Sequence, residues 1–290
     1  MAAPSRHLPH GMNVVVKAPW WVGTKAVSVI ESIGHQVTFL GRVLGAVPRT
    51  LTHYRRQTGS LLVDMTWGNG SIIVGGGTIG VLVFLGAAVG ASVGVEGYAA
   101  LDMVGMGPLT GFVSAYADTR EMAPMIAAIG FAAQAGCRMT AEIGAMRISE
   151  EIDALEAQGI QSIPFVVTTR VIAGMITIVP LFMLTLIMSY LSAAFVVNVV
   201  HGQSSGTYYH YFDTFIQPSD VFFAVIKAAI FVTLIIAIHG YQGFYAGGGP
   251  EGVGRASGRA IRTSLITVVI ADMVLTLLFW GNDPGIRISG

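Results

Sequence analysis

Two long stretches of this sequence carry no charged side chain, and they restrict the possible folds more than any other feature. No Asp, Glu, Lys or Arg occurs between Asp64 and Glu96, or from Val171 to Phe212. An apolar helix of about 20 residues crosses the hydrocarbon layer of a bilayer, which is roughly 30 Å thick. The 290 residues are 53% hydrophobic and 11% charged, whereas soluble domains are about a quarter charged. The sequence therefore predicts an all-α membrane protein.

The apolar segments predict five membrane-spanning helices. We expect them at residues 72–95, 109–137, 171–200, 221–245 and 262–280. Glycines four residues apart in the first span, at Gly86, Gly90 and Gly94, predict close contact with a neighbouring helix. Lys227 is expected near the outer end of the fourth span, where its amine could reach the interface. The glycine-rich segment 247–256 is expected to be an irregular loop before the fifth span.

The five-span domain is expected to cover residues 61–282, between an N-terminal region (1–60) and a short outer tail (283–290). From Val22 to Val47, apolar residues recur every three or four positions among charged ones. This spacing predicts an amphipathic helix that ends at Pro48. Trp20 and Trp21 at its start favour a position in the headgroup layer, with the apolar face toward the lipid.

The distribution of basic residues predicts the orientation in the membrane. The N-terminal region carries seven Lys or Arg, and the segments 138–170 and 251–262 carry three each. The segments on the opposite side carry one, Arg287. Because basic loops stay on the cytoplasmic side, we expect a cytoplasmic N-terminus and an outward-facing C-terminus. The aromatic residues of 208–212 would form an interfacial belt on the outer side.

Residues 141–159 form the only dense charged segment enclosed by long apolar runs. Apolar residues at i, i+4 and i+7 predict one buried helix face. These residues are Ile148, Ile152 and Leu155. Arg147 could pair with Glu150 and Glu151 at i+3 and i+4, and Gly159 is a candidate C-cap. The pattern predicts an amphipathic helix of about three turns over residues 145–158, with a solvated loop as the alternative.

The same segment resembles a family signature. TAEIG at Thr140–Gly144 and MRISEEIDALE at Met146–Glu156 are similar to the signature of MlaE/YrbE-type permeases, and the resemblance covers about residues 20–282. REMAP at Arg120–Pro124 resembles the family's R-E-L-G-P stretch, with departures at Met122 and Ala123. In that family the charged segment is a cytoplasmic coupling helix that docks on a separate ATPase. The resemblance implies this role for Arg147, Glu150, Glu151, Asp153, Ala154 and Leu155.

The resemblance also implies the partners. It indicates an ABC lipid transporter of the inner membrane with two permease chains, an ATPase dimer and outer-side MCE-domain proteins. The N-terminal extension and the aromatic outer segment are most similar to actinobacterial YrbE members, which pair as unlike chains and import fatty acids, mycolic acids or sterols. The sequence contains no G-x-x-x-x-G-K-[ST] motif. We therefore expect no cofactor in this chain and ATP bound by the partner subunit.

Four charged residues fall inside the predicted spans, namely Asp118, Arg120, Glu121 and Asp272. Such residues are costly in lipid unless they are paired or face a cavity. Two interpretations follow, a buried structural ion cluster and a set of substrate contacts. His201 and His210, nine residues apart, are only a weak pattern for a metal site, and none is predicted.

Two other functions remain open. A non-transporting scaffold or assembly subunit would tolerate Glu151→Lys without loss of ATPase activity in its complex. An intramembrane lipid-modifying enzyme would use Ser92, within the G-x-S-x-G match at Gly90–Gly94, or the pair Asp118 and Glu121. The formal net charge of zero gives no indication of a nucleic-acid partner.

Overall fold

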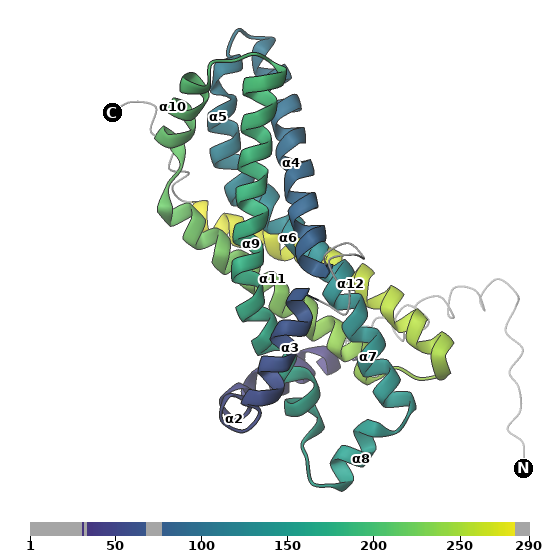
Figure 1. The fold of residues 1–290 in the computed structure, drawn as a ribbon. Coiled ribbons are helices and arrows are strands. Elements are labelled where there is room, and N and C mark those ends of the chain that lie inside the picture. Colours follow the sequence, from purple (N-terminus) through teal and green to yellow (C-terminus); the bar gives the residue numbers. More distant parts are fainter. Residues whose placement is uncertain (1–30, 32–33, 68–76, 282–290) are drawn as a thin grey trace, which may run out of the picture.

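The computed structural model describes residues 31, 34–67 and 77–281 (Figure 1). The structure is 90% helical, and the part of the chain that it describes contains no strand. The predicted all-α fold class is therefore confirmed. The outer tail at 283–290, with Arg287, lies outside the described residues.

The described part of the N-terminal region is helical except at Ala46 and Tyr54. Residues 34–45 form a helix, a turn at Ala46 leads into α2 (Val47–His53), and α3 (Arg55–Trp67) follows. The predicted start of the first helix, with Trp20 and Trp21, falls outside the described residues. Its end at residue 45 lies three residues before Pro48, close to the predicted end. Pro48 lies in the first turn of α2, a position that favours proline.

Four helices are long and apolar enough to cross a membrane. They are α4 (Gly77–Asp102), a continuous helix over residues 163–200, α11 (Pro218–Phe244) and α12 (Gly249–Trp280). The second of these joins η5 (Ile163–Thr168), α9 (Thr169–Phe195) and η6 (Val196–Val200). They correspond to the first, third, fourth and fifth predicted spans.

The second predicted span is helical but segmented. Its elements are η2 (Gly107–Leu109), α5 (Thr110–Val113), η3 (Ser114–Met122), α6 (Ala123–Phe131), η4 (Ala132–Gly136) and α7 (Cys137–Ile148). Both η3 and η4 are π-helical. Pro124, in the first turn of α6, has no N–H for the carbonyl of Arg120, and the Lys227 Nζ donates to that oxygen at 2.9 Å. The count of five spanning helices is therefore not confirmed by helix length.

The glycines of α4 bring it into backbone contact with α9, as their spacing predicts. A Cβ on Gly86 would lie 2.4 Å from the Thr185 carbonyl oxygen. A Cβ on Gly90 would lie 2.0 Å from that of Ser189. Such distances are shorter than any real contact, so only glycine permits this approach.

The start of α12 corrects the prediction of an irregular loop at residues 247–256. Gly248 adopts φ 86° as the N-cap, and the helix runs from Gly249 onward. The glycines that favour a loop have a packing role instead. A Cβ on Gly252 would lie 1.8 Å from the Gly247 carbonyl oxygen, and Val253 fits against Gly144 of α7. Gly144 lies inside the continuous helix α7 and allows α12 to pack closely against it.

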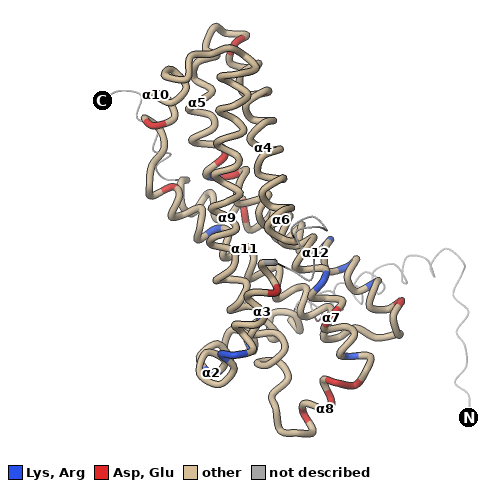
Figure 2. Tube along the Cα trace, in the orientation of Figure 1, with Lys and Arg blue, Asp and Glu red and all other residues tan. Residues whose placement is uncertain are grey.

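The helices form an elongated bundle (Figure 1). At one end α10 (Ser205–Phe215) lies against α5 and η3. At the other end lie α2, α3, α7 and α8 (Glu151–Ala157), and the acidic residues of α8 mark the tip in Figure 2. We refer to these as the α10 end and the α8 end.

Candidate functional site

The charged segment folds as two helices rather than one. α7 stops at Ile148, Ser149 follows as its C-cap, and α8 starts at Glu151. Between them Glu150 has φ 61°, a left-handed conformation that non-glycine residues rarely adopt. The Ser149 Oγ donates to the Ala145 carbonyl at 3.0 Å, which helps to end α7. Residues 145–158 therefore do not form the single three-turn helix that the sequence predicted, because the helix is broken at Ser149 and Glu150.

This break changes the predicted contacts. Arg147 pairs with Asp153, at 2.7 Å, and not with the two glutamates, because the turn displaces α8 from the axis of α7. Ile152 is fully buried and Leu155 packs against the core, whereas Ile148 is 39% exposed. Two of the three residues predicted to form the apolar face, Ile152 and Leu155, thus pack into the protein, and Ile148 does not.

The outer surface of α8 is acidic and open. It consists of the exposed residues Glu150, Glu151, Asp153 and Ala154, which we call the α8 surface. At the C-terminus of α8, Gly159 adopts φ 77°, and the Ile160 N–H donates to the Leu155 carbonyl at 3.0 Å. The Ser162 hydroxyl donates to the Glu156 carboxylate. The predicted Gly159 cap is confirmed, and α8 is held at both ends.

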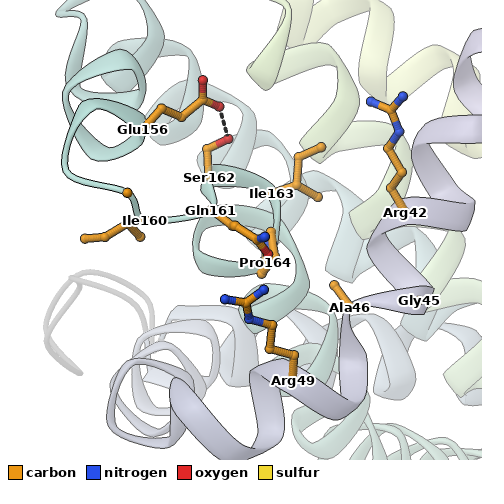
Figure 3. Close-up of a pocket in the computed structure, with 11 residues that line it drawn as sticks. Arg42, Gly45, Ala46, Arg49, Glu156, Ile160, Gln161, Ser162, Ile163 and Pro164 are labelled. Atoms are coloured by element: carbon orange, nitrogen blue, oxygen red, sulfur yellow. Dashed lines mark hydrogen bonds between the residues drawn. The ribbon is translucent and has the colours of Figure 1, made fainter.

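A pocket lies beside α8, between the junction of the helix at residues 34–45 with α2 and the segment that leads from α8 into η5 (Figure 3). Arg42 and Arg49 line it from the junction, and Glu156 and Pro164 line it from the segment. The sequence analysis did not identify this pocket, because its two walls are more than 100 residues apart in the chain.

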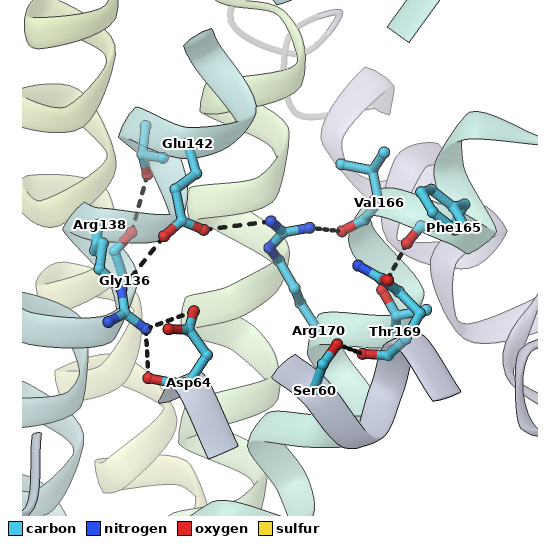
Figure 4. A network of polar contacts seen from close by, with 11 residues as sticks. Ser60, Asp64, Gly136, Arg138, Glu142, Phe165, Val166, Thr169 and Arg170 are labelled. Atoms are coloured by element: carbon cyan, nitrogen blue, oxygen red, sulfur yellow. Dashed lines mark hydrogen bonds and ion pairs between the residues drawn. The ribbon is translucent and has the colours of Figure 1, made fainter. Parts of the chain in front are cut away.

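An ion-pair network connects α7 to its neighbours (Figure 4). Arg138 of α7 bonds Asp64 of α3 twice, to the carbonyl at 2.7 Å and to the carboxylate at 3.1 Å. Glu142, one turn further, pairs with Arg138 at 3.4 Å and with Arg170 of α9 at 3.3 Å. Arg170 also donates to the Val166 carbonyl at 2.6 Å. These contacts tie α7 to α3 and α9.

The sequence analysis missed this network. The i, i+4 spacing of Arg138 and Glu142 was a usable signal for one of its pairs. Asp64 and Arg170 lie far away in the chain, and their partners depend on tertiary packing.

A second set of charges lies within the bundle. The buried Arg120 guanidinium pairs with Asp220 of α11 at 2.7 Å, and the Trp280 indole N–H donates to the other Asp220 oxygen at 2.9 Å. The Lys227 ammonium contacts Glu121 at 3.0 Å and Asp272 at 2.6 Å. Two ion-paired groups therefore tie η3 to α11 and α12.

Lys227 corrects one prediction. Its side chain is completely buried and does not reach the interface, because two carboxylates offset the cost of removing the ammonium from water. Of the four charged residues predicted in the spans, Glu121 and Asp272 meet at Lys227. Arg120 pairs with Asp220, and Asp118 accepts a hydrogen bond from Ser114 at 3.0 Å. The sequence analysis did not place Lys227 or Asp220 in this cluster.

The aromatic segment at the α10 end is a helix with one buried side. Tyr208 is 1% exposed, and burial raises the pKa of its hydroxyl to about 12, so it stays neutral. Tyr209 is 45% exposed, as expected of a belt residue. His201 stacks on Tyr98 at a centroid distance of 4.2 Å, whereas His210 lies on α10.

These features define a multi-pass helical membrane protein with a short, rigidly attached helix at one end. The protein belongs to the MlaE permease family, because residues 69–278 match the family model described as Permease MlaE. That family consists of permease subunits of transport systems and not of enzymes. The lipid-modifying alternative is therefore set aside. In agreement, Ser92 lies inside the uninterrupted helix α4, without the strand and turn of a nucleophile elbow.

Three relatives illustrate the similarity. A probable ABC transporter permease protein of Rickettsia bellii is 34% identical over 162 residues, which cover 56% of this chain and 62% of the relative. Protein TRIGALACTOSYLDIACYLGLYCEROL 1, chloroplastic, of Arabidopsis thaliana is 30% identical, covering 70% of this chain and 58% of the relative. The intermembrane phospholipid transport system permease protein MlaE of Haemophilus influenzae is 26% identical, over 88% of this chain and 98% of the relative. This chain thus spans about three fifths of the length of the first two relatives.

Proposed function

We propose that this chain is the membrane-spanning permease subunit of an ABC-type lipid transporter of the inner membrane. A separate ATPase dimer docks on the α8 surface. The observation that carries the proposal is the geometry of α8, a short helix with exposed acids on one side and a fully buried Ile152 on the other. The family and the names of the relatives, which include ABC transporter permease and phospholipid transport permease, support it.

The α8 surface suits a basic partner. Glu150, Glu151 and Asp153 are exposed, and charge complementarity of this kind selects partners and orients docking. Ala154 lies among them and would allow close approach. Because Ile152 and Leu155 pack into the chain itself, they hold α8 in place and leave the contact to the acids. Arg147 fixes Asp153 at 2.7 Å.

Force on α8 has a short route into the membrane. α8 is joined to α7 on one side and through residues 158–162 to η5 and α9 on the other. The Arg138, Glu142 and Arg170 contacts connect the same two helices and add α3. A rigid element attached to two others in this way can convert a displacement at the tip into a shear of packed helices.

The complete transporter would contain further subunits. We propose a second permease chain, an unlike paralogue, because a single bundle of this size leaves its apolar α12 side exposed, including Ile266 and Leu277. MCE-domain proteins would bind at the α10 end, which faces outward, and the α8 end would face the cytoplasm. The substrate is a hydrophobic lipid of the fatty acid, mycolic acid or sterol class.

The test reverses charge on the α8 surface. Glu150→Lys or Glu151→Lys leaves the chain inserted, because both side chains are exposed, but uncouples ATP hydrolysis from lipid movement. ATPase activity and lipid uptake are measured on the reconstituted complex. Glu251→Lys is the matched control, since Glu251 is an exposed acid at the start of α12. Normal uptake in a chain carrying both α8 changes contradicts the proposal and favours a scaffold subunit.

A further inference from the structure

The pocket beside α8 has the size and the chemistry of a ligand site. Its volume is about 740 Å³, within the range of about 300 to 1,000 Å³ typical of small-molecule sites. One wall is formed by the helix at residues 34–45 and the start of α2, and the other by the end of α8, the linker after it and the start of η5 (Figure 3). The residues of the α8 surface and the charged residues within the bundle do not line the pocket.

Two cations without partners line this pocket. Arg42 lies in the helix at residues 34–45 and Arg49 lies in α2, on either side of the turn at Ala46, and both line the pocket. Both are exposed, and among the residues that the structure describes neither guanidinium has an ion pair. The nearest acid in the pocket, Glu156, is already bonded to Ser162 (Figure 3). The pocket therefore offers two free guanidinium groups to an anion.

The surface between the two arginines is open. Gly45 lies between them in the chain, at the end of the helix at residues 34–45, and a Cβ added there would have no atom within 4 Å. Across the pocket the start of η5 contributes apolar surface from Ile163 and Pro164. The site thus combines a cationic side with an apolar side, as an amphiphile requires.

The pocket lies at one end of a helix that is longer than the hydrocarbon layer is thick. The helix that begins at Ile163 is 38 residues long, about 57 Å at 1.5 Å per residue, and roughly twice the thickness of the hydrocarbon layer. Such a helix extends beyond the hydrocarbon, and we expect its Ile163 end, which lines the pocket, to lie in the headgroup layer.

The two helices that carry the arginines also expose apolar side chains. Val37 is 61% exposed, Leu44 44% and Leu51 47%. A helix with exposed leucines beside arginines is typical of a segment that lies on a lipid surface. This composition favours a lipid over a protein side chain as the occupant.

We propose that this pocket binds the phosphate of an anionic phospholipid headgroup, with Arg42 and Arg49 as the donors. Guanidinium groups match phosphate oxygens in geometry and form charge-assisted pairs with them. The lipid would be a bound component that anchors the N-terminal helix against the linker. The proposal concerns a lipid other than the transported one and does not depend on ATPase docking at α8.

The test places a carboxylate between the arginines. Gly45→Glu supplies an internal anion, and Gly45→Gln is a neutral control of nearly the same size, which the open space accommodates. Full-length complex is reconstituted in phosphatidylcholine nanodiscs that contain a photoreactive phosphatidylglycerol, and crosslinks are mapped by mass spectrometry. We expect crosslinks at residues 42–49 and 160–164 in the native chain and in Gly45→Gln, and about tenfold fewer in Gly45→Glu, equivalent to about 1.4 kcal/mol.

Further arms identify the source of the anion. The double variant Arg42→Gln with Arg49→Gln should lose the crosslinks as Gly45→Glu does. Equal crosslinking by a photoreactive phosphatidylcholine, or equal yields in Gly45→Glu and Gly45→Gln, would overturn the proposal. Loss of the crosslinks on addition of inorganic phosphate would assign the pocket to a free anion and overturn the lipid assignment. Protection of the same residues by the ATPase alone would assign it to a protein partner.

Discussion

Lys227 is the residue that holds the interior charges together. Its ammonium is fully buried and touches Glu121, Asp272 and the Thr276 hydroxyl within 3.0 Å. It also donates to the Arg120 carbonyl that Pro124 leaves without a helical donor. This one side chain of α11 therefore contacts polar groups of both η3 and α12 and holds these elements together. Buried ions of this kind are costly to separate, because the remaining partner is left uncompensated in a medium of low dielectric constant.

Substitution of Asp272 tests this role. Asp272→Leu removes one of the two carboxylates at Lys227 and should destabilise the chain by about 3 kcal/mol. Asp272→Asn should be milder, because the amide oxygen still accepts a hydrogen bond. Thermal unfolding of the purified complex in detergent measures both, with Glu251→Gln as an exposed control. Equal loss of folded complex in the two variants would count against a hydrogen-bonding role for Asp272.

At the scale of elements, the break between α7 and α8 sets the direction of the α8 surface. Glu150 adopts φ 61°, and left-handed conformations cost an L-residue about 1 to 2 kcal/mol. The surrounding contacts, namely buried Ile152 and the Arg147–Asp153 pair, maintain this conformation. Local strain that the structure maintains often marks a functional segment.

A pair of neutral substitutions measures this strain. Glu150→Gly and Glu150→Ala both remove the charge, but only glycine adopts a positive φ without strain. We expect α8 to be more stable in the glycine variant by about 1 kcal/mol, which is about fivefold in hydrogen-exchange protection of residues 151–157. The same protection in both variants would show that the left-handed turn carries no strain.

These elements also show what the sequence could and could not predict. Runs of apolar residues located four of the helices, and glycines four residues apart correctly indicated the close contact of α4 with α9. The left-handed turn was not predictable, because glutamate has an ordinary helix propensity. The surroundings of Lys227 depend on Glu121, which is 106 residues away, and a hydropathy pattern does not indicate which helix faces which. The same limitation hid the arginine pocket beside α8.

At the scale of the molecule, the α8 end carries the features that the proposed transport cycle requires. The α8 surface, the network around Glu142 and the arginine pocket all lie there, next to the ends of α3, α7 and α9. The opposite half exposes apolar side chains of α4 and α12 such as Phe84 and Leu278, at 73% and 70%. We infer that lipid and a second permease cover these faces, while the ATPase binds the α8 end.

The claim that α8 lies on the cytoplasmic side and binds the ATPase is tested most directly by the accessibility of α8 to a labelling reagent. A single cysteine at Ala154, in a Cys137→Ser background, is labelled with a membrane-impermeant maleimide in intact cells and in inverted vesicles. We predict labelling from the cytoplasmic side alone, and protection of the cysteine when the ATPase is bound. Labelling only from outside the cell would contradict the orientation and the ATPase-docking role of α8 together.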